Sequence, residues 1–357
     1  MKTLDRAASA AFLLLCALVV ASPAHAAKYK INWLLAHNNL DFFREAADNF
    51  KKTVEQGSHG DIAVNIVTAA SDGQWDTAGQ PGTAPNIAAE VEAGRAEMGH
   101  SFTDVMGAVD RRYMAFEAPY LFRGYQHMEG VIDGPVGTEM LDGLRAHHMV
   151  GLCFTYSGGG NGVASTRREI RGPEDLKGLK VGVYGDEVNA AWLKSLGATP
   201  VAIEHRLGRI TEMARDGSLD AVAITWRNFE RTELSEDFKY YNMPGSTYLV
   251  SMTYMNEDFY NSLPKAYQKL IMSASRKTAR IERAKTIELN EIGRRAMEAK
   301  GVQPVYLSEQ GRAAFSAALK PAYKSAIEPV LGKGLLEKIR ATPDGAYPSV
   351  LGDFASR

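Results

Sequence analysis

The chain has 357 residues, of which 45% are hydrophobic and 23% charged, a composition typical of globular proteins rather than disordered or coiled-coil chains. At roughly 100 to 200 residues per domain, this length predicts two domains whose cores need no disulfide bonds. The 41 Lys and Arg residues balance 42 Asp and Glu residues to a net charge of -1. The chain therefore lacks the positive field that dominates nucleic-acid binding, and we expect no nucleic-acid partner.

The N-terminus has the pattern of a secretory signal peptide. Lys2 and Arg6 precede a nearly continuous apolar run over residues 7–21, and small residues follow it. The run is shorter than the ~20 residues that a membrane-spanning helix needs, so we favour a signal peptide over a membrane anchor and predict that residues 1–26 are removed. The product would be a soluble periplasmic protein in which Cys153 is the single cysteine, buried and without a disulfide partner.

Predicted strands and helices then alternate in two successive sets. The first set has strands at 29–35, 61–67 and 97–101 and helices at about 40–55, 86–93 and 101–109. The second set has strands at 179–183, 199–203 and 219–224 and helices at 173–176, 189–196 and 208–215. Because strands alternate with helices, each set predicts an α/β unit with parallel strands.

Two features connect these units. An apolar strand over 149–156 ends in Ser157 and three glycines. A glycine cluster after a strand can bind phosphate, but no Gly-Lys-Ser/Thr motif follows, and we interpret the glycines as a hinge or crossover. After Pro264 the chain is rich in Ala, Lys, Arg and Glu as far as Lys300, which predicts one long helix that ties both units together.

The sequence contains no catalytic constellation. Its eight histidines include no i, i+4 pair of the kind that binds a metal on a helix, and no pair of cysteines is available for zinc. The Gly-x-Ser-x-Gly motif of hydrolases is absent as well. We therefore expect no cofactor, and a secreted α/β enzyme is the least supported function.

Aromatic and hydrogen-bonding residues gather where the predicted strands end and in a long loop over 69–85. Ligands of open α/β sheets bind beyond the carboxyl ends of the strands. Two such units that face each other would enclose a cleft between them. The candidate ligand-binding residues are His37, Asn39, Trp75, Asp76, Phe102, Tyr156, Asn161, Tyr184, Asp186, Glu187, His205, Thr225, Trp226 and Arg227.

Several motifs occur in a specific order between about residues 28 and 325. They are Glu117-Ala-Pro-Tyr-Leu-Phe122, Pro173-Glu-Asp-Leu-Lys-Gly-Leu-Lys180, Leu196-Gly-Ala-Thr-Pro200, Asp216-Gly-Ser-Leu-Asp220 and the segment from Asn256 to Pro264 with Tyr267-Gln268. In this order they resemble the solute-binding proteins of tripartite ATP-independent periplasmic (TRAP) transporters, of the dicarboxylate-binding-protein (DctP) type.

The resemblance implies an α/β, two-domain periplasmic binding protein of the type II-like class, with hinge strands and a long helix that spans both domains. Domain I would comprise residues 27–157 with about 248–285, and domain II residues 158–247 with about 286–357. A monomer would close over a small molecule in the manner of a Venus flytrap and deliver it to the membrane permease subunits. The alternative function is a ligand receptor that signals to a membrane sensor kinase.

The arginines that hold a ligand carboxylate in this family have no counterpart here. By alignment they fall at Gly182 and at Gly162 or the neighbouring Asn161. A desolvated carboxylate without a positive partner is costly, so either Arg227 or Arg168 substitutes, or the solute is not an acid.

Other departures bear on the class of solute. Asp186 and Glu187, together with nearby aromatic rings, would suit an amine or another cation. The solute is thus an organic acid, an amine or an aromatic compound. Some family members that bind α-keto acids hold a metal with a Glu-Trp pair, but this chain has Thr225-Trp226 there, so we expect no metal.

Overall fold

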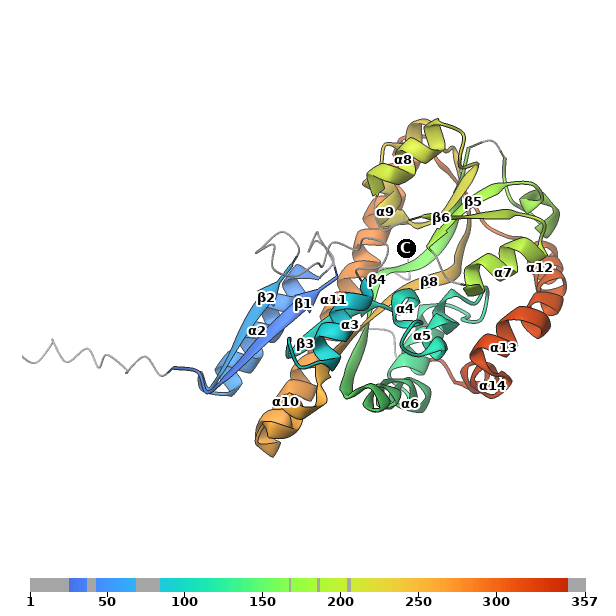
Figure 1. The fold of residues 1–357 in the computed structure, drawn as a ribbon. Coiled ribbons are helices and arrows are strands. Elements are labelled where there is room, and N and C mark those ends of the chain that lie inside the picture. The colour runs from blue at the N-terminus through green and yellow to red at the C-terminus, as the bar shows by residue number, and fades with distance from the viewer. Residues whose placement is uncertain are drawn as a thin grey trace, which may run out of the picture.

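The computed structural model describes residues 26–36, 43–68, 84–166, 168–184, 187–203 and 207–345. These residues form one mixed β-sheet with helices on both faces (Figure 1). Its strands are β1 (Tyr29–Leu35), β2 (Ile62–Val67), β3 (Met98–Phe102), β4 (Met149–Ser165), β5 (Lys180–Tyr184), β6 (Thr199–Ile203), β7 (Ala221–Thr225), β8 (Tyr240–Asn256) and β9 (Gln303–Val305).

The helices connect and cover these strands. The α-helices are α2 (Arg44–Gly57), α3 (Ala84–Glu92), α4 (Thr103–Met106), α5 (Tyr125–Ile132), α6 (Pro135–Asp142), α7 (Glu187–Ser195), α8 (Leu207–Arg215), α9 (Trp226–Glu230), α10 (Glu257–Ser262), α11 (Lys265–Ala299), α12 (Glu309–Ala322), α13 (Glu328–Leu331) and α14 (Lys333–Ala341). Shorter turns are η1 (Arg111–Glu117), η2 (Gly143–His147), η3 (Pro173–Leu176), η4 (Leu234–Glu236) and the π-helical turn η5 (Tyr323–Ile327).

The sheet consists of two parallel units joined by a central antiparallel pair. Its order is β2-β1-β3-β8-β4-β7-β5-β6, and β9 pairs with β8. β1 is parallel to β2 and β3, and β5 is parallel to β6 and β7. β4 and β8 are antiparallel to each other and to the adjoining strands β7 and β3. The prediction of an α/β fold built from two parallel units is therefore confirmed.

The central strands β4 and β8 each have 17 residues. The strand predicted over 149–156 does not end at the glycines, because β4 continues through them to Ser165. The glycines form a bulge instead, and the register with β8 shifts between Thr155 and Gly159. Gly159 has a φ of 69°, a left-handed conformation that costs glycine little. The bulge therefore interrupts the pairing at the middle of the sheet without ending the strand.

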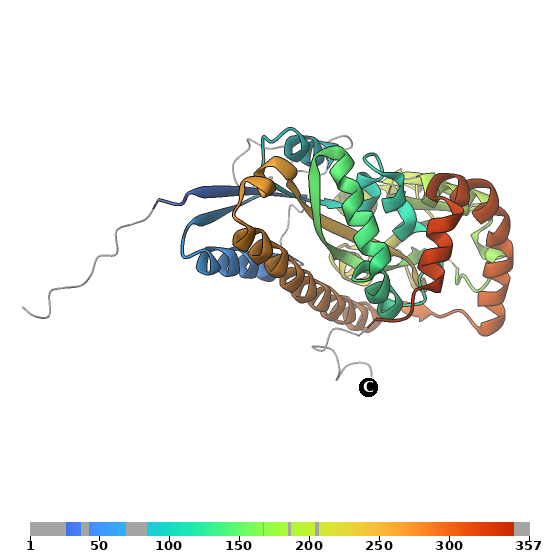
Figure 2. The ribbon, with the colours of Figure 1, turned by 90° about the horizontal axis from the view of Figure 1, so that it is seen from below.

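The predicted long helix is confirmed as α11, which has 35 residues. It packs against α2, β4 and α9, elements that come from both parallel units. Figure 2 shows α11 running along one side of the sheet. Most of the remaining predicted elements are also present, with ends that differ by a few residues, and the predicted loop over 69–85 lies almost entirely outside the described residues.

Alternation along β1 shows how the two faces of the sheet build separate cores. Ile31, Trp33 and Leu35 pack with α2 and α11 on one face, while Leu34 joins the core on the other face. This period of two is the pattern expected of a strand that is covered on both sides. Cys153 of β4 is buried as predicted, and this burial raises the pKa of its thiol to about 12.

The division of the chain into two domains stays a prediction. The C-terminal helix α14 contacts elements of the first half of the chain: Lys338 Nζ lies 2.6 Å from Glu139 Oε2 of α6. Just beyond α14, Asp344 pairs with Arg123 at 2.7 Å. In the described part of the chain, none of the helices combines the length and the apolar character that a membrane span requires.

Candidate functional site

The carboxyl ends of the two parallel units meet at the middle of the central strand pair. Phe102, the last residue of β3, pairs with Ser251 of β8, and Ser251 also pairs with Thr155 of β4. On the other side, the last residue of β7, Thr225, pairs with Asn161 of β4. The two strand ends are therefore separated along β4 by the glycine bulge alone, which is where ligands of open α/β sheets bind.

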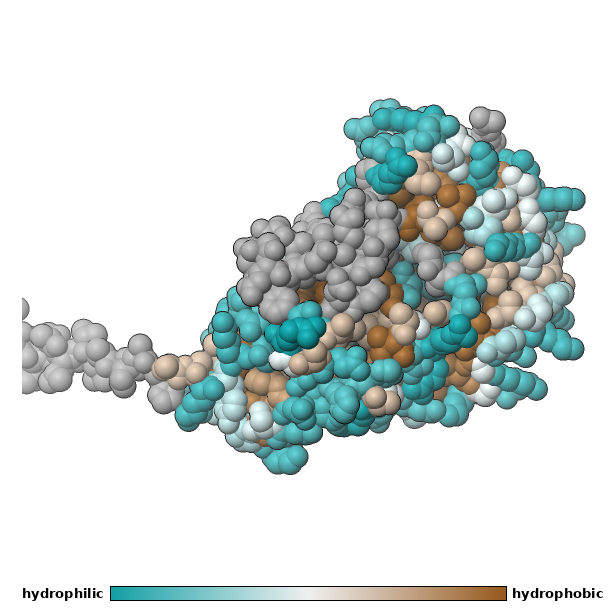
Figure 3. Space-filling model, in the orientation of Figure 1, coloured by the Kyte–Doolittle hydropathy of each residue, from teal (hydrophilic) through white to brown (hydrophobic). Residues whose placement is uncertain are grey.

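A hollow opens on this side of the molecule. Figure 3 shows apolar residues within it, between the region of α8 and β6 and the region of α4. Residues of the candidate site that lie outside the described residues are His37, Asn39, Trp75, Asp76, Asp186 and His205.

The predicted residues at the ends of β3 and β7 are buried and contact other parts of the protein. Thr225 Oγ1 accepts a 3.2 Å hydrogen bond from the backbone N–H of Asn228 and so caps α9. The Trp226 ring stacks on Tyr241, with 3.6 Å between ring centroids and 20° between planes. Phe102 directly precedes α4 and is 6% exposed. Trp226 therefore has one ring face covered by the protein itself.

The predicted residues on β4 have different surroundings. Tyr156 is fully buried, and its hydroxyl donates a 2.7 Å hydrogen bond to Glu129 Oε1 on α5. Asn161 Nδ2 donates to Thr247 Oγ1 at 3.3 Å, whereas the buried Oδ1 of Asn161 has no hydrogen-bond donor among the described residues. Asn161 thus offers an unsatisfied acceptor at the end of the glycine bulge.

Arg227 and Glu187 each take part in an ion pair, and Arg168 lies away from the converging strand ends. The Arg227 guanidinium pairs with Glu230 one turn along α9, so a bound carboxylate would share it. Arg168 is exposed and follows the end of β4 at which Ser165 pairs with the first residue of β7, far from the carboxyl end of that strand. Glu187 begins α7 and lies 3.0 Å from Arg111.

Two buried carboxylates that are not among the predicted ligand-binding residues lie near Tyr184 at the end of β5. Asp104 is in the first turn of α4, and Glu117 ends η1. Burial and these two carboxylates raise the pKa of Tyr184 above its ordinary value. Glu117 Oε2 also accepts a 2.8 Å hydrogen bond from Asn189 of α7. Asp104 comes two residues after a strand end, so the rule that selected the other candidates could have found it.

Both glycines at the aligned arginine positions are closely packed. A Cβ atom at Gly162 would lie 2.3 Å from the Tyr241 ring. At Gly182 it would lie 3.2 Å from the side chains of Ile203 and Leu219. The phenol of Tyr241 is fixed because its hydroxyl donates a 2.7 Å hydrogen bond to the carbonyl of Ile224. Larger side chains are therefore excluded at residue 162 and disfavoured at residue 182 by the surrounding core.

Two α/β units whose strand ends converge on a bulged central pair form the architecture of a protein that binds a small molecule at those strand ends. The chain matches the family described as bacterial extracellular solute-binding protein, family 7 (DctP), over residues 36–329. It belongs to this family and is a solute-binding protein rather than an enzyme. In the described part of the chain, no group of His, Cys, Asp and Glu is arranged to hold a metal ion.

Relatives and solved structures extend over most of the chain. A solute-binding protein of Verminephrobacter eiseniae is 26% identical over 299 residues, covering 83% of this chain and 84% of the relative. The 2,3-diketo-L-gulonate-binding periplasmic protein of Escherichia coli is 22% identical over 277 residues, covering 77% and 79%. A TRAP periplasmic solute-binding protein from Roseobacter denitrificans, solved with β-D-glucuronate, has a TM-score of 0.75 at 22% identity, covering 88% of this chain and 100% of that one.

Proposed function

We propose that the protein is a periplasmic receptor that captures a small polar organic solute where the two units meet and delivers it to TRAP permease subunits. Family membership supports the transport role, and the signal-peptide pattern of residues 1–26 supports export. The observation that carries the proposal is the convergence of both sets of strand ends on the glycine bulge. Closure of the two units there would exclude water and strengthen every polar contact to the solute.

The solute we propose is one that presents hydrogen-bond donors or a positive charge, such as an amine. Asp104 and Glu117 place two buried carboxylates beside Tyr184, and Asn161 adds an unsatisfied acceptor. The relatives solved or named with β-D-glucuronate and 2,3-diketo-L-gulonate take acids. In this chain the Tyr241 ring fills the space beside Gly162, so an arginine that would hold a ligand carboxylate has no room at residue 162.

The first experiment identifies the solute directly. Mass spectrometry of the denatured protein would detect whatever co-purifies with it. A thermal-shift screen would then compare matched amines, carboxylates and polyols, because a ligand that binds only the native state raises the melting temperature. We expect amines or polyols to give the largest shifts. A response confined to carboxylates would overturn the proposed solute class, and no response to any class would count against the receptor function.

A pair of variants tests the role of the buried carboxylate on α4. Asp104→Asn keeps the shape of the side chain but removes its charge, so the affinity for an amine should fall at least about tenfold, or ~1.4 kcal/mol. Asp258→Asn on α10, which is exposed, makes the same chemical change outside the site and serves as the control. Equal affinities in the two variants would remove Asp104 from the binding site.

A further inference from the structure

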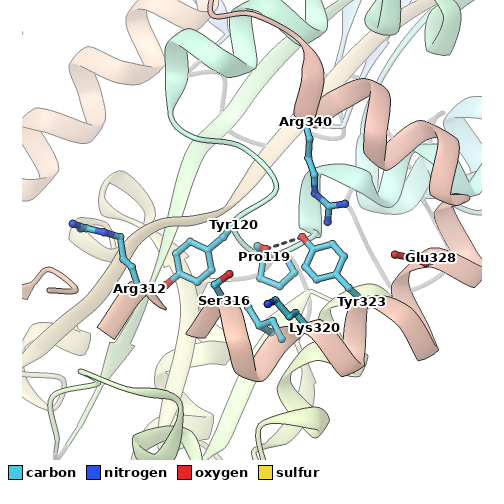
Figure 4. Close-up of a pocket in the computed structure, with 9 residues that line it drawn as sticks. Pro119, Tyr120, Arg312, Ser316, Lys320, Tyr323, Glu328 and Arg340 are labelled. Carbon is cyan, nitrogen blue, oxygen red and sulfur yellow. Dashed lines mark hydrogen bonds between the residues drawn. The ribbon is translucent and has the colours of Figure 1, made fainter. Parts of the chain in front are cut away.

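A second cavity lies apart from the convergent strand ends, between the C-terminal helices and the turn that follows η1. Its volume is about 480 Å³, within the range of about 300–1,000 Å³ that small-molecule sites occupy. None of its lining residues belongs to the candidate site described above. They are Pro119, Tyr120, Arg312, Ser316, Leu319, Lys320, Tyr323, Glu328 and Arg340 (Figure 4).

The charges around this cavity are unbalanced. Arg312, Lys320 and Arg340 carry three positive charges, and Glu328 carries the only negative charge among the lining residues. None of the three cations has a carboxylate oxygen within 4.0 Å among the described residues. The partners they do have are neutral: Arg312 Nη1 donates to the carbonyl of Leu307 at 2.8 Å, and Arg340 lies 4.8 Å from the centroid of the Tyr323 ring.

Two fixed tyrosine rings form the apolar part of the wall. The Tyr323 hydroxyl donates a 2.7 Å hydrogen bond to the carbonyl of Pro119, which Figure 4 shows as a dashed line between the two walls. The Tyr120 ring packs against Phe315 with 6.0 Å between centroids. Because both rings are already held in place, binding of a planar ligand would cost little side-chain entropy.

The backbone is irregular on both sides of the cavity. Tyr120 has a φ of 56°, a left-handed conformation that is uncommon for a residue with a large side chain. The backbone N–H of Tyr120 donates to the carbonyl of Ser246 in the central strand β8 at 2.8 Å. On the opposite wall, Tyr323 begins the π-helical turn that follows Pro321 within α12. Strained backbone and π-helical turns both concentrate at functional sites.

We propose that this cavity is a second binding site, which takes a small organic carboxylate with a flat apolar body. Lys320 and Arg340 provide the positive charge for the carboxylate, and the rings of Tyr120 and Tyr323 cover the body. A dication does not match this lining, because the three cations would repel it. A neutral polyol does not match either, because the apolar rings would remove water from its hydroxyl groups without replacing the hydrogen bonds.

The test uses 4-fluorobenzoate as the probe and fluorine NMR of the purified protein as the readout. We expect saturable binding to the native protein. In the double variant Lys320→Ala with Arg340→Gln, the affinity should fall at least tenfold. Lys324→Ala removes an exposed cation in the same turn that does not line the cavity, and it should bind as the native protein does.

The cationic probe 4-fluorobenzylamine has the same ring and the opposite charge, so it separates charge recognition from binding of the ring alone. Any binding of 4-fluorobenzylamine should be equally strong in the native protein and in the variants at Lys320 and Arg340. The proposal is overturned if 4-fluorobenzoate does not saturate, or if the double variant binds it as tightly as the Lys324 variant does. Single variants at Lys320 and Arg340 keep the test valid should the double variant fail to fold.

Discussion

The carboxyl group of Glu282 on α11 accepts a 2.6 Å hydrogen bond from the backbone N–H of Tyr156, at the start of the glycine bulge in β4. Thr286, one helical turn further on, contacts the carbonyl of the same tyrosine at 2.7 Å. One more turn along, Asn290 Nδ2 donates to the carbonyl of Gly158. A polar stripe at i, i+4 and i+8 thus fixes the bulged middle of the sheet to the long helix.

A proton on Glu282 satisfies every hydrogen-bonding group of this stripe. The Thr286 hydroxyl lies 2.7 Å from the Tyr156 carbonyl and 2.8 Å from Glu282 Oε1, but it has only one proton to donate. If Thr286 donates to the carbonyl, the protonated carboxyl of Glu282 donates to Thr286, and all groups are satisfied. Burial favours the same state, because it raises the pKa of Glu282 to about 8.

We therefore predict that Glu282→Gln is tolerated and Glu282→Ala is not. The amide of Gln accepts from Tyr156 and donates to Thr286, as the protonated acid does, and the free energy of unfolding should change by no more than about 1 kcal/mol. Alanine leaves the buried N–H of Tyr156 without an acceptor and opens a cavity, which should cost about 2–4 kcal/mol. Urea unfolding near pH 4.5, before the proton-linked loss of wild-type stability sets in, measures both. Equal losses in the two variants would contradict the proton on Glu282.

The stability of the protein should fall between pH 4.5 and about pH 8 because of this group. The pKa of Glu282 is raised from 4.5 to about 8 in the native state, so between these values the native chain holds a proton that the unfolded chain has released. The stabilisation is complete below pH 4.5 and is lost as pH rises through 8, at up to about 1.4 kcal/mol per pH unit.

Other ionisable groups face Glu282, and the comparison must separate them from it. Arg283 is its neighbour on α11, Glu129 approaches from α5, and Cys153 approaches from β4. Asp133, the C-cap of α5, pairs with Arg283. Glu282→Gln retains all of these, so the difference in unfolding free energy between the wild type and this variant isolates Glu282. That difference should shrink from pH 8 to pH 5, and a constant difference would contradict the prediction.

The neighbouring Arg283 supports the same region through charge. It is 1% exposed and lies 3.3 Å from Glu129 Oε2 and 2.7 Å from Asp133 Oδ2. Arg283→Met should destabilise the protein by about 3–5 kcal/mol, because the buried Glu129 carboxylate loses its positive partner. Adding Glu129→Gln removes the unpaired charge while the amide oxygen still accepts from Tyr156, so the double variant should recover most of the loss. A double variant no more stable than the single one would show that packing, not charge, dominates.

Strand positions could be predicted well from the sequence where apolar runs are bounded by turn residues. The strands over 29–35 and 199–203 have the predicted ends. A charged residue bounds each pattern on one side, Lys28 before the first and Glu204 after the second. β8 was not predicted from the sequence, since Pro244-Gly245 interrupts it and its pairing with β4 joins segments far apart in sequence. That pairing is a tertiary property that no local pattern contains.

The candidate site could be predicted in position but not in orientation. The strand-end rule selected Phe102 and Thr225, and the structure has them as the last residues of β3 and β7, on either side of the glycine bulge. It could not show that Tyr156 hydrogen-bonds Glu129 or that Trp226 stacks on Tyr241, because side-chain direction depends on packing partners from other elements. The ligand-binding roles of the predicted residues stay predictions.

The glycine beside the Tyr241 ring provides the last prediction. A methyl group at residue 162 would lie 2.3 Å from Tyr241 Cε1 and 2.8 Å from the carbonyl of Asn242, so Gly162→Ala should destabilise the protein by about 1–3 kcal/mol. Gly334→Ala is the matched control: nothing lies within 4 Å of its Cβ on the exposed face of α14, and the better helix former should stabilise by about 0.5–1 kcal/mol. Denaturant unfolding of both variants measures the contrast. If Gly162→Ala were neutral, Tyr241 would not be what excludes a larger side chain there, and an arginine at that position would again be compatible with the fold.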